Sequence, residues 1–161
     1  MEYMISIHMK SIKNNFNDPA VNKLLIKHFV ELRSVSPEGS AHVLDIEGLK
    51  SPSIKFWSLW DKNKLIGCGA LKLLNKFHGE FKSIRVADNF RKKGYGIVII
   101  NYLLKEARIL KLKEICVETG AGLFFKPARN LFEKSGFKKC KPFAHYTNDP
   151  NSCYYKFKII D

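Results

Sequence analysis

The sequence has little that would place a protein in a membrane, export it or give it a metal. No apolar run approaches the roughly 18 residues that a membrane span needs. Residues 1–6 lack a basic segment followed by a long apolar one, so no secretory signal is expected. The four cysteines show no C-x-x-C spacing, and the five histidines form no H-E-x-x-H pair. We therefore expect a cytoplasmic protein with reduced thiols, no metal and no membrane partner.

The composition that is present is typical of one folded domain. Hydrophobic residues make up 45% of the 161 residues and charged residues 27%, so we expect a single domain over residues 1–161. The net charge is +13, which attracts anions of any kind. RNA, DNA and phosphate-bearing small molecules all fit, and a basic bias across a proteome would give the same charge. No RRM, KH or zinc signature is present, so no specific nucleic-acid partner is expected.

Hydrophobic spacing predicts strands and helices in mixed order. A first strand is expected at 3–9, and a helix from Pro19 to about Arg33, with Asp18 as its N-cap. A short second helix is expected at 42–49. The other expected elements are a hairpin at 54–60 and 65–74, strands at 80–86 and 114–118, helices at 94–110 and 127–135, and closing strands at 137–141 and 154–160. This order predicts a mixed sheet flanked by helices.

A basic, glycine-containing turn stands between a predicted strand and a long predicted helix. Arg91, Lys92 and Lys93 precede Gly94 and Gly96. Helix N-termini bind phosphate through unpaired N–H groups, and glycine lets the backbone come close. The turn has no G-K-[ST] ending and no third glycine, so it is neither a P-loop nor a Rossmann fingerprint. By itself it is consistent with a phosphate site or with a tight turn carrying solvated charges.

The spacing R-x-x-G-x-G at 91–96 resembles the acetyl-CoA signature of the GNAT N-acetyltransferases. A second segment, A-R-N-L-F-E-K-S-G-F at 128–137, is similar to the family's A-x-x-L-Y-E-K-x-G-F. The preceding hairpin and the closing strands also match, so the resemblance covers nearly the whole chain. Segments at 33–37, 42–45, 56–58, 67–72 and 78–80 look like a YsnE-like bacterial subgroup of acetyltransferases.

The resemblance implies an α/β fold with a mixed, mostly antiparallel central sheet. In that fold the strands at 80–86 and 114–118 splay apart and acetyl-CoA lies in the gap. Pantetheine would pair with the backbone of the first strand, and the pyrophosphate would meet the N–H groups of the turn. A backbone N–H near Val86 would polarise the thioester carbonyl. The implied cofactor-binding residues are Ile84, Arg85, Val86, Arg91, Lys92, Lys93, Gly94, Tyr95, Gly96 and Ile97.

Two positions depart from the family's pattern. Phe132 stands where the family often has the tyrosine that protonates the leaving thiolate, and Phe125 stands where it often has asparagine. Phenylalanine cannot donate a proton, so water or another tyrosine would have to serve. Both departures leave open a protein that binds acyl-CoA without catalysis.

Acetylation of an amine needs a base that removes a proton from the ammonium group. Glu80, at the start of one central strand, is the first candidate, and Glu118, at the end of the next, is the second. Tyr146, in a polar loop at 144–150, is a candidate acid. Each of the three has a plain structural alternative as a solvated, ion-paired or packing side chain.

The region after the first helix walls the acceptor pocket in GNAT folds. The candidate substrate-binding residues there are Arg33, Ser36, His42 and Asp45. Arg33 suggests an acceptor that carries a carboxylate, although a cap on the C-terminus of its own helix is an equal explanation.

The favoured function is an acetyl-CoA-dependent N-acetyltransferase that acts without a metal. The acceptor would be the primary amine of a small metabolite, which attacks directly in a ternary complex. Two alternatives stay open: a non-catalytic acyl-CoA sensor, and a basic protein associated with nucleic acid or the ribosome. Dimers are common in the family, so a homodimer is also open.

Overall fold

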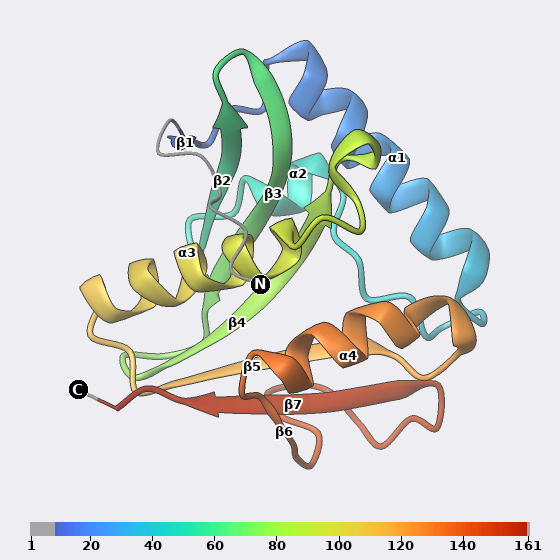
Figure 1. The fold of residues 1–161 in the computed structure, drawn as a ribbon. Helices are drawn as coiled ribbons and strands as arrows, with labels where there is room; N and C mark the ends of the chain where they lie inside the picture. The colour runs from blue at the N-terminus through green and yellow to red at the C-terminus, as the bar shows by residue number, and fades with distance from the viewer. Residues whose placement is uncertain (1–8, 161) are drawn as a thin grey trace.

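The computed structural model describes residues 9–160, and its centre is one twisted sheet flanked by helices (Figure 1). The strands are β1 (Met9–Lys13), β2 (Ile54–Asp61), β3 (Lys64–Leu73), β4 (His78–Val86), β5 (Glu114–Gly120), β6 (Lys138–Lys139) and β7 (Ser152–Lys158). The helices are α1 (Pro19–Val35), α2 (Ile46–Leu49), α3 (Tyr95–Ile109) and α4 (Lys126–Lys134), with short 3-10 turns η1 (Asp88–Phe90) and η2 (Leu123–Phe125). The α/β fold class is as predicted.

The sheet has the strand order β1-β2-β3-β4-β5-β7-β6 in the described part of the chain. All neighbouring strands are antiparallel except β4 and β5, which are parallel. This parallel pair is short: it runs from His78 opposite Glu114 to Glu80 opposite Cys116. Beyond that point β4 and β5 no longer pair with each other, so the sheet opens into a V (Figure 1).

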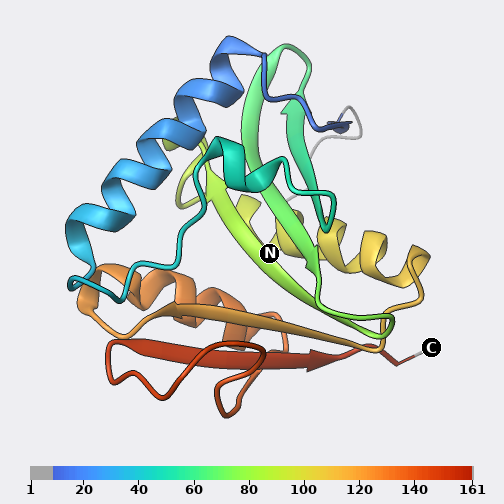
Figure 2. The same cartoon turned by 180° about the vertical axis from the view of Figure 1, so that it is seen from behind.

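The first arm of the V, β1 to β4, carries a hydrophobic core on each face. In β2, Trp57 and Leu59 face α3, whereas Phe56 and Trp60 face α1 and α2. This alternation follows from the two-residue period of a strand. Figure 2 shows α1 and α2 on one side of this arm, with the segment between them running along the opening of the V. The second arm is covered by α4, where Phe132 packs against Phe137 and Tyr155.

The ends of the helices follow their sequence signals. The Asp18 side chain accepts hydrogen bonds from the backbone N–H groups of Ala20 (2.9 Å) and Val21 (3.2 Å), and Pro19 opens α1 as predicted. The predicted helix at 42–49 is shorter than expected. Because the Asp45 side chain accepts from the N–H of Gly48 at 2.8 Å, Asp45 is the N-cap and α2 begins only after it.

The edges of the sheet differ most from prediction. The expected strand at 3–9 lies outside the described residues except for Met9, and the structure has an edge strand at Met9–Lys13. The closing strand expected at 137–141 contains only Lys138–Lys139. No helix in the described part of the chain combines the length and apolar character needed to cross a membrane.

Candidate active site

A cavity of about 690 Å³ opens where β4 and β5 separate. Its walls come from α1, the segment between α1 and α2, both splayed strands, the start of α3, α4 and one tyrosine of the loop before β7. A volume of this size suits a cofactor together with a small substrate. The cavity therefore lies where the sequence predicts the cofactor.

A bulge in β4 shapes one wall of this cavity. Lys82 pairs with Ala70 of β3, whereas the next partnered residue, Arg85, pairs with Cys68, so β4 holds one residue more than β3 over this stretch. Ser83 has φ of +53°, outside the strand region. Bulges re-aim side chains next to active sites. Here the bulge separates Glu80 and Lys82, before it, from Arg85, after it.

The start of α3 is built to receive an anion. Gly94 is its N-cap with φ of +86°, a left-handed conformation that glycine adopts without strain. No side chain caps the first turn of α3, so its N–H groups keep their capacity to donate. Arg91 and Lys92 line the cavity beside this turn. Together they form a positively charged, donor-rich end of the cavity.

Nine of the ten predicted cofactor residues line the cavity, and Lys93 lies outside it, donating to the backbone oxygen of Asn89 at 3.2 Å. Arg85 turns toward α1, where its guanidinium donates to both oxygens of Glu31 at 3.0 and 3.3 Å. Gly96 has a packing role as well. A Cβ there would lie 2.8 Å from Cδ2 of Leu131, so glycine lets α3 approach α4 closely.

Glu80, Lys82 and Tyr146 form a buried hydrogen-bonded cluster. The Tyr146 hydroxyl donates to Oε2 of Glu80 at 2.5 Å. Lys82 Nζ donates to the same oxygen at 3.3 Å and to the Tyr146 oxygen at 3.1 Å. Glu80 is only 1% exposed, and its Oε1 has no hydrogen-bond partner among the described residues. Glu80 and Tyr146, two predicted catalytic residues that lie 66 positions apart in the sequence, are thus in direct contact.

Glu118 faces the same cavity from β5, and Ser152 Oγ donates to its Oε2 at 3.3 Å. Burial raises the pKa of this carboxyl from 4.5 to about 7, against a smaller opposing effect of Lys82. A carboxyl with this pKa exchanges protons at neutral pH, which is the property that a general base needs. Glu80 already accepts hydrogen bonds from Tyr146 and Lys82, so these contacts and the raised pKa of Glu118 together make Glu118 the better candidate for the proton acceptor.

Tyr146 is enclosed by aromatic and charged groups. Its ring lies edge-on to His42 at 5.0 Å between centroids and stacks on His145 at 4.6 Å. Burial, followed by the charge of Glu80, raises the pKa of Tyr146 well above its usual value. Burial and Lys82 lower the pKa of His42. Near neutral pH the tyrosine therefore keeps its proton and His42 is mostly uncharged.

The four predicted substrate residues separate into two pairs. Ser36 and His42 line the cavity. Arg33 is exposed and lies over the ring of Phe29, 5.4 Å from its centroid, while Asp45 is occupied as the cap of α2. Arg33 and Asp45 are therefore outside the cavity.

Sequence reasoning passed over Lys82 and His28 as lining residues. Lys82 had a usable signal, because it is two residues from Glu80 in a strand and so shares its face. His28 had a weaker one, since its position in the apolar repeat of α1 placed it on the buried face without showing what that face meets.

The two phenylalanines that depart from the family's pattern both line the cavity. Phe132 is 5% exposed and packs against Phe137 and Tyr155, so an aromatic ring without a hydroxyl fills this position. Phe125 packs over Gly120, where a Cβ would overlap its ring. These rings make the α4 side of the cavity apolar.

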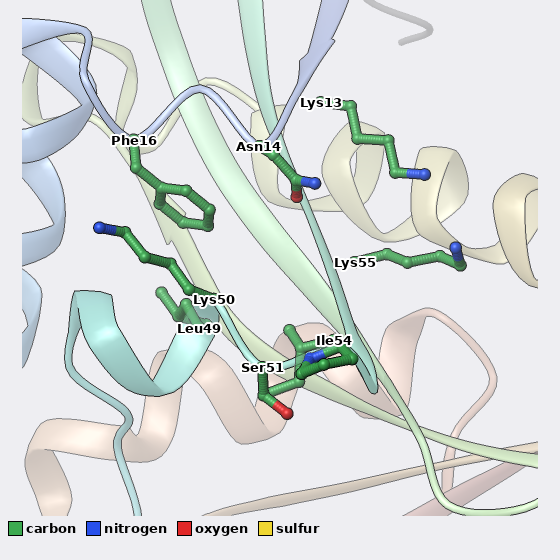
Figure 3. A pocket seen from close by; sticks show the side chains of 9 residues that line it. Lys13, Asn14, Phe16, Leu49, Lys50, Ser51, Ile54 and Lys55 are labelled. Atoms are coloured by element: carbon green, nitrogen blue, oxygen red, sulfur yellow. The ribbon is translucent and has the colours of Figure 1, made fainter.

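A second cavity, of about 360 Å³, lies at the end of β1 near α2 (Figure 3). Phe16, Leu49 and Ile54 form its apolar side, and Lys13 and Lys55 stand at its rim. Its lining includes no carboxylate, thiol or histidine. It therefore lacks the acid–base groups of the larger cavity. Among the described residues, no three His, Cys, Asp or Glu side chains come together as a metal site would require.

Comparisons with known proteins identify the family of this chain. The model of the acetyltransferase (GNAT) family matches residues 19–137. The uncharacterized N-acetyltransferase YsnE of Bacillus subtilis is 40% identical over 139 residues, 86% of this chain and 92% of the relative. The uncharacterized N-acetyltransferase YedL of Escherichia coli is 36% identical over 148 residues, 92% of this chain and 93% of the relative.

The fold is also shared with solved structures. A GNAT family acetyltransferase from Elizabethkingia anophelis, with acetyl-CoA bound, superimposes with a TM-score of 0.66 at 16% identity, covering 96% of this chain and 100% of the other. At this identity the likeness shows the fold, while the family match and the two relatives carry the assignment. The chain therefore belongs to the acetyltransferase (GNAT) family and is an N-acetyltransferase.

Proposed function

We propose that this chain transfers the acetyl group of acetyl-CoA to the primary amine of a small metabolite, by direct attack in a ternary complex. One observation carries the proposal. The donor-rich start of α3 and the Glu118 carboxyl, whose pKa is about 7, line the same cavity. A phosphate-bearing acyl donor and a proton acceptor therefore have places within one open cavity.

Acetyl-CoA is held along the open V. Its pyrophosphate meets the free N–H groups of α3, with Arg91 and Lys92 adding charge. Its pantetheine arm runs between the separated strands, past Ile84 and Val86 of β4. The Elizabethkingia relative of the same fold binds acetyl-CoA, which supports this placement.

The chemical step needs a neutral amine at the thioester carbon. Glu118 accepts a proton from the substrate ammonium, directly or through water, and the amine nitrogen then attacks the carbonyl carbon. A C–N bond forms, the C–S bond breaks and CoA leaves as a thiolate. The amide nitrogen gives up its second proton to solvent, and the thiolate takes one from solvent.

Tyr146 and Glu80 hold the site rather than move the reacting protons. Because the pKa of Tyr146 is raised, proton transfer from its hydroxyl to a thiolate is unfavourable. That hydroxyl already donates to Glu80, and Lys82 binds both. We assign this cluster the role of fixing the floor of the acceptor pocket.

Steady-state kinetics test the proposal. The protein is mixed with acetyl-CoA and a panel of small primary amines. CoA release is followed with a thiol reagent, and the acetylated products are identified by mass spectrometry. Amide formation above the no-enzyme rate supports the proposal. Tight acetyl-CoA binding without any acetylated amine contradicts it.

The second outcome would favour a non-catalytic acyl-CoA sensor. One observation favours that function: the buried Phe132 ring occupies the position of the family's usual proton donor. The same assay separates the two functions, because a sensor binds acetyl-CoA without releasing CoA.

A further inference from the structure

The acceptor side of the cavity contains buried polar atoms that the proposed chemistry does not use. Four residues that line it each have a polar atom without a hydrogen-bond partner in the described part of the chain: His28 (Nδ1) of α1, and Glu80 (Oε1), Ser83 (Oγ) and Arg85 (Nε) of β4. Glu80 Oε1 can only accept, whereas Ser83 and Arg85 offer donors. A buried polar group left unpaired destabilises a fold, so four around one cavity call for an explanation.

The Arg85 side chain is held in place so that one donor is left over. Its two terminal nitrogens donate to the two oxygens of Glu31 at 3.0 and 3.3 Å. This fork fixes the guanidinium plane, and the side chain is only 5% exposed. The third nitrogen of the guanidinium, Nε, has no acceptor for its N–H among the described residues. Arg85 is therefore preorganised, with an unused, charge-assisted donor.

Ser83 lies two residues before Arg85, within the bulge. Its φ of +53° takes it out of the strand conformation, and its hydroxyl lacks a partner in the described structure. His28 completes the group. Burial, followed by the charge of Arg85, lowers the pKa of His28 to about 4, so its ring is neutral near pH 7 and adds no competing charge.

The surrounding charges favour an anion over a second cation here. Lys82, on the same strand, lines the cavity with its side chain 9% exposed. Arg91 lines the cavity near His28 and adds to the lowering of that pKa. Two carboxylates face the Arg85 guanidinium, Glu31 at 3.0 Å and Asp88 at 3.9 Å, and Lys27 and Arg91 also pair with Asp88. This ion-pair network has three cations and two anions, so one positive charge is in excess. Lys82 and Glu80 balance each other.

Resting on the proposed function, we propose that the acceptor carries a carboxylate beside its primary amine, and that Arg85 and Ser83 bind this carboxylate. The carboxylate oxygens accept from Nε of Arg85 and Oγ of Ser83, which satisfies two of the four unpaired atoms. Both donor atoms are buried in the described structure, so these side chains turn toward the cavity when the acceptor binds. The amine is then directed toward Glu118 on the opposite strand. The substrate class is that of amino acids, in place of simple alkylamines or peptide-internal amines.

Paired substrates test this inference. Each acid of a panel of L-α-amino acids and ω-amino acids is compared with its carboxamide, which keeps the amine and removes the negative charge. We expect kcat/KM to favour the acid by about ten-fold or more, as a charge-assisted hydrogen bond supplies. Equal or faster turnover of the carboxamides overturns the inference and leaves the N-acetyltransferase proposal standing.

Variants test which residues cause the preference for acids over carboxamides. Ser83→Ala removes one donor and is expected to reduce the acid-to-carboxamide ratio several-fold. The double change Glu31→Gln and Arg85→Gln removes the charged donor without leaving Glu31 unpaired, and is expected to bring the ratio close to one. Ser53→Ala, whose hydroxyl contacts Ser51 outside the cavity, is the matched control and should keep the ratio. A ratio unchanged in both cavity variants contradicts the role of Arg85 and Ser83.

A binding measurement separates this inference from the proposed function. Acids and carboxamides are titrated by calorimetry into the protein loaded with CoA. Preferential binding of acids that depends on Arg85 supports the inference, even where no turnover follows. Absence of any preference for acids overturns it, even where amines are acetylated.

Discussion

At the residue scale the account depends most on Glu118. Replacing it by glutamine keeps its size and removes the proton acceptor. Because general-base catalysis contributes about 10²–10⁴-fold, we expect Glu118→Gln to lower kcat/KM by about 100-fold or more. The wild-type rate should fall as pH drops below about 7, where the carboxyl becomes protonated. The variant should lack this acidic limb of the pH–rate profile. Initial rates of CoA release from pH 5.5 to 9 measure both effects.

Glu114→Gln is the control, because Glu114 begins the same strand outside the cavity. It should keep both the rate and the pH limb. If Glu80→Gln removes the limb and Glu118→Gln does not, the base is Glu80 and the assignment made here is wrong.

The same carboxyl makes a prediction about stability. The folded state raises the pKa of Glu118 from 4.5 to about 7, so the unfolded chain ionises it first as pH rises. Wild-type protein should therefore lose up to about 3 kcal/mol of unfolding free energy between pH 4.5 and 7 through this group. Urea unfolding of wild type and Glu118→Gln should show the variant gaining relative stability over that range. A difference that does not change with pH would contradict the burial of this carboxyl.

At this scale, the sequence predicted which residues line the cavity better than it predicted their catalytic roles. Glu80, Glu118 and Tyr146 do share one cavity, as the strand ends and the late loop suggested. The order of preference between the two glutamates needed the structure, since burial and hydrogen bonding arise from elements far apart in sequence. Arg33 illustrates the opposite failure: its charge type suited the pocket, but its position on α1 turns it outward.

At the element scale, the turn from β5 into η2 positions Phe125 against the cavity. A Cβ at Gly120 would overlap the Phe125 ring, whereas a Cβ at Gly122 would meet nothing within 4 Å. We expect Gly120→Ala to lower the unfolding free energy by about 1–3 kcal/mol, as overpacking does, and to weaken acetyl-CoA binding by moving Phe125. Gly122→Ala, two residues away, should change stability by less than about 0.5 kcal/mol. Thermal melts and acetyl-CoA titrations of the pair measure this, and equal behaviour would contradict it.

Most elements followed from local signals, and the exceptions have a physical cause. The capped start of α1, the β2–β3 hairpin and the glycine at the start of α3 are encoded by neighbouring residues. The bulge at Ser83 and the short parallel contact of β4 with β5 are set by pairing between distant strands, which no local pattern states. The site depends on those two features, so its outline was predictable and its geometry was not.

At the scale of the whole molecule, the net charge of +13 strengthens the binding of any anion at low salt. We expect acetyl-CoA affinity to fall by roughly three- to ten-fold between 50 and 200 mM NaCl, because screening weakens the field at Arg91 and Lys92 while the helix N–H bonds persist. Non-specific binding of a 20-nucleotide RNA should be lost by about 0.2 M salt. Calorimetry and filter binding measure the two. RNA binding that survives that salt would contradict the account and favour a nucleic-acid function.

Homodimer formation and a cytoplasmic location stay predictions at this scale. The family and fold do not depend on either, because the cavity is built from elements of one chain. The most direct test is therefore made on the isolated chain.

The central claim is that the V between β4 and β5 binds acetyl-CoA at the start of α3. Calorimetric titration of acetyl-CoA compares the parent with the double variant Arg91→Ala and Gly94→Glu, which puts an anion where the pyrophosphate binds. Asn63→Glu with Lys64→Ala, in the exposed β2–β3 turn, makes the same change in net charge and is the control. We predict micromolar binding by the parent and the control, and none by a still-folded cavity variant. Failure of the parent to bind, or equal binding by the cavity variant, would contradict the account.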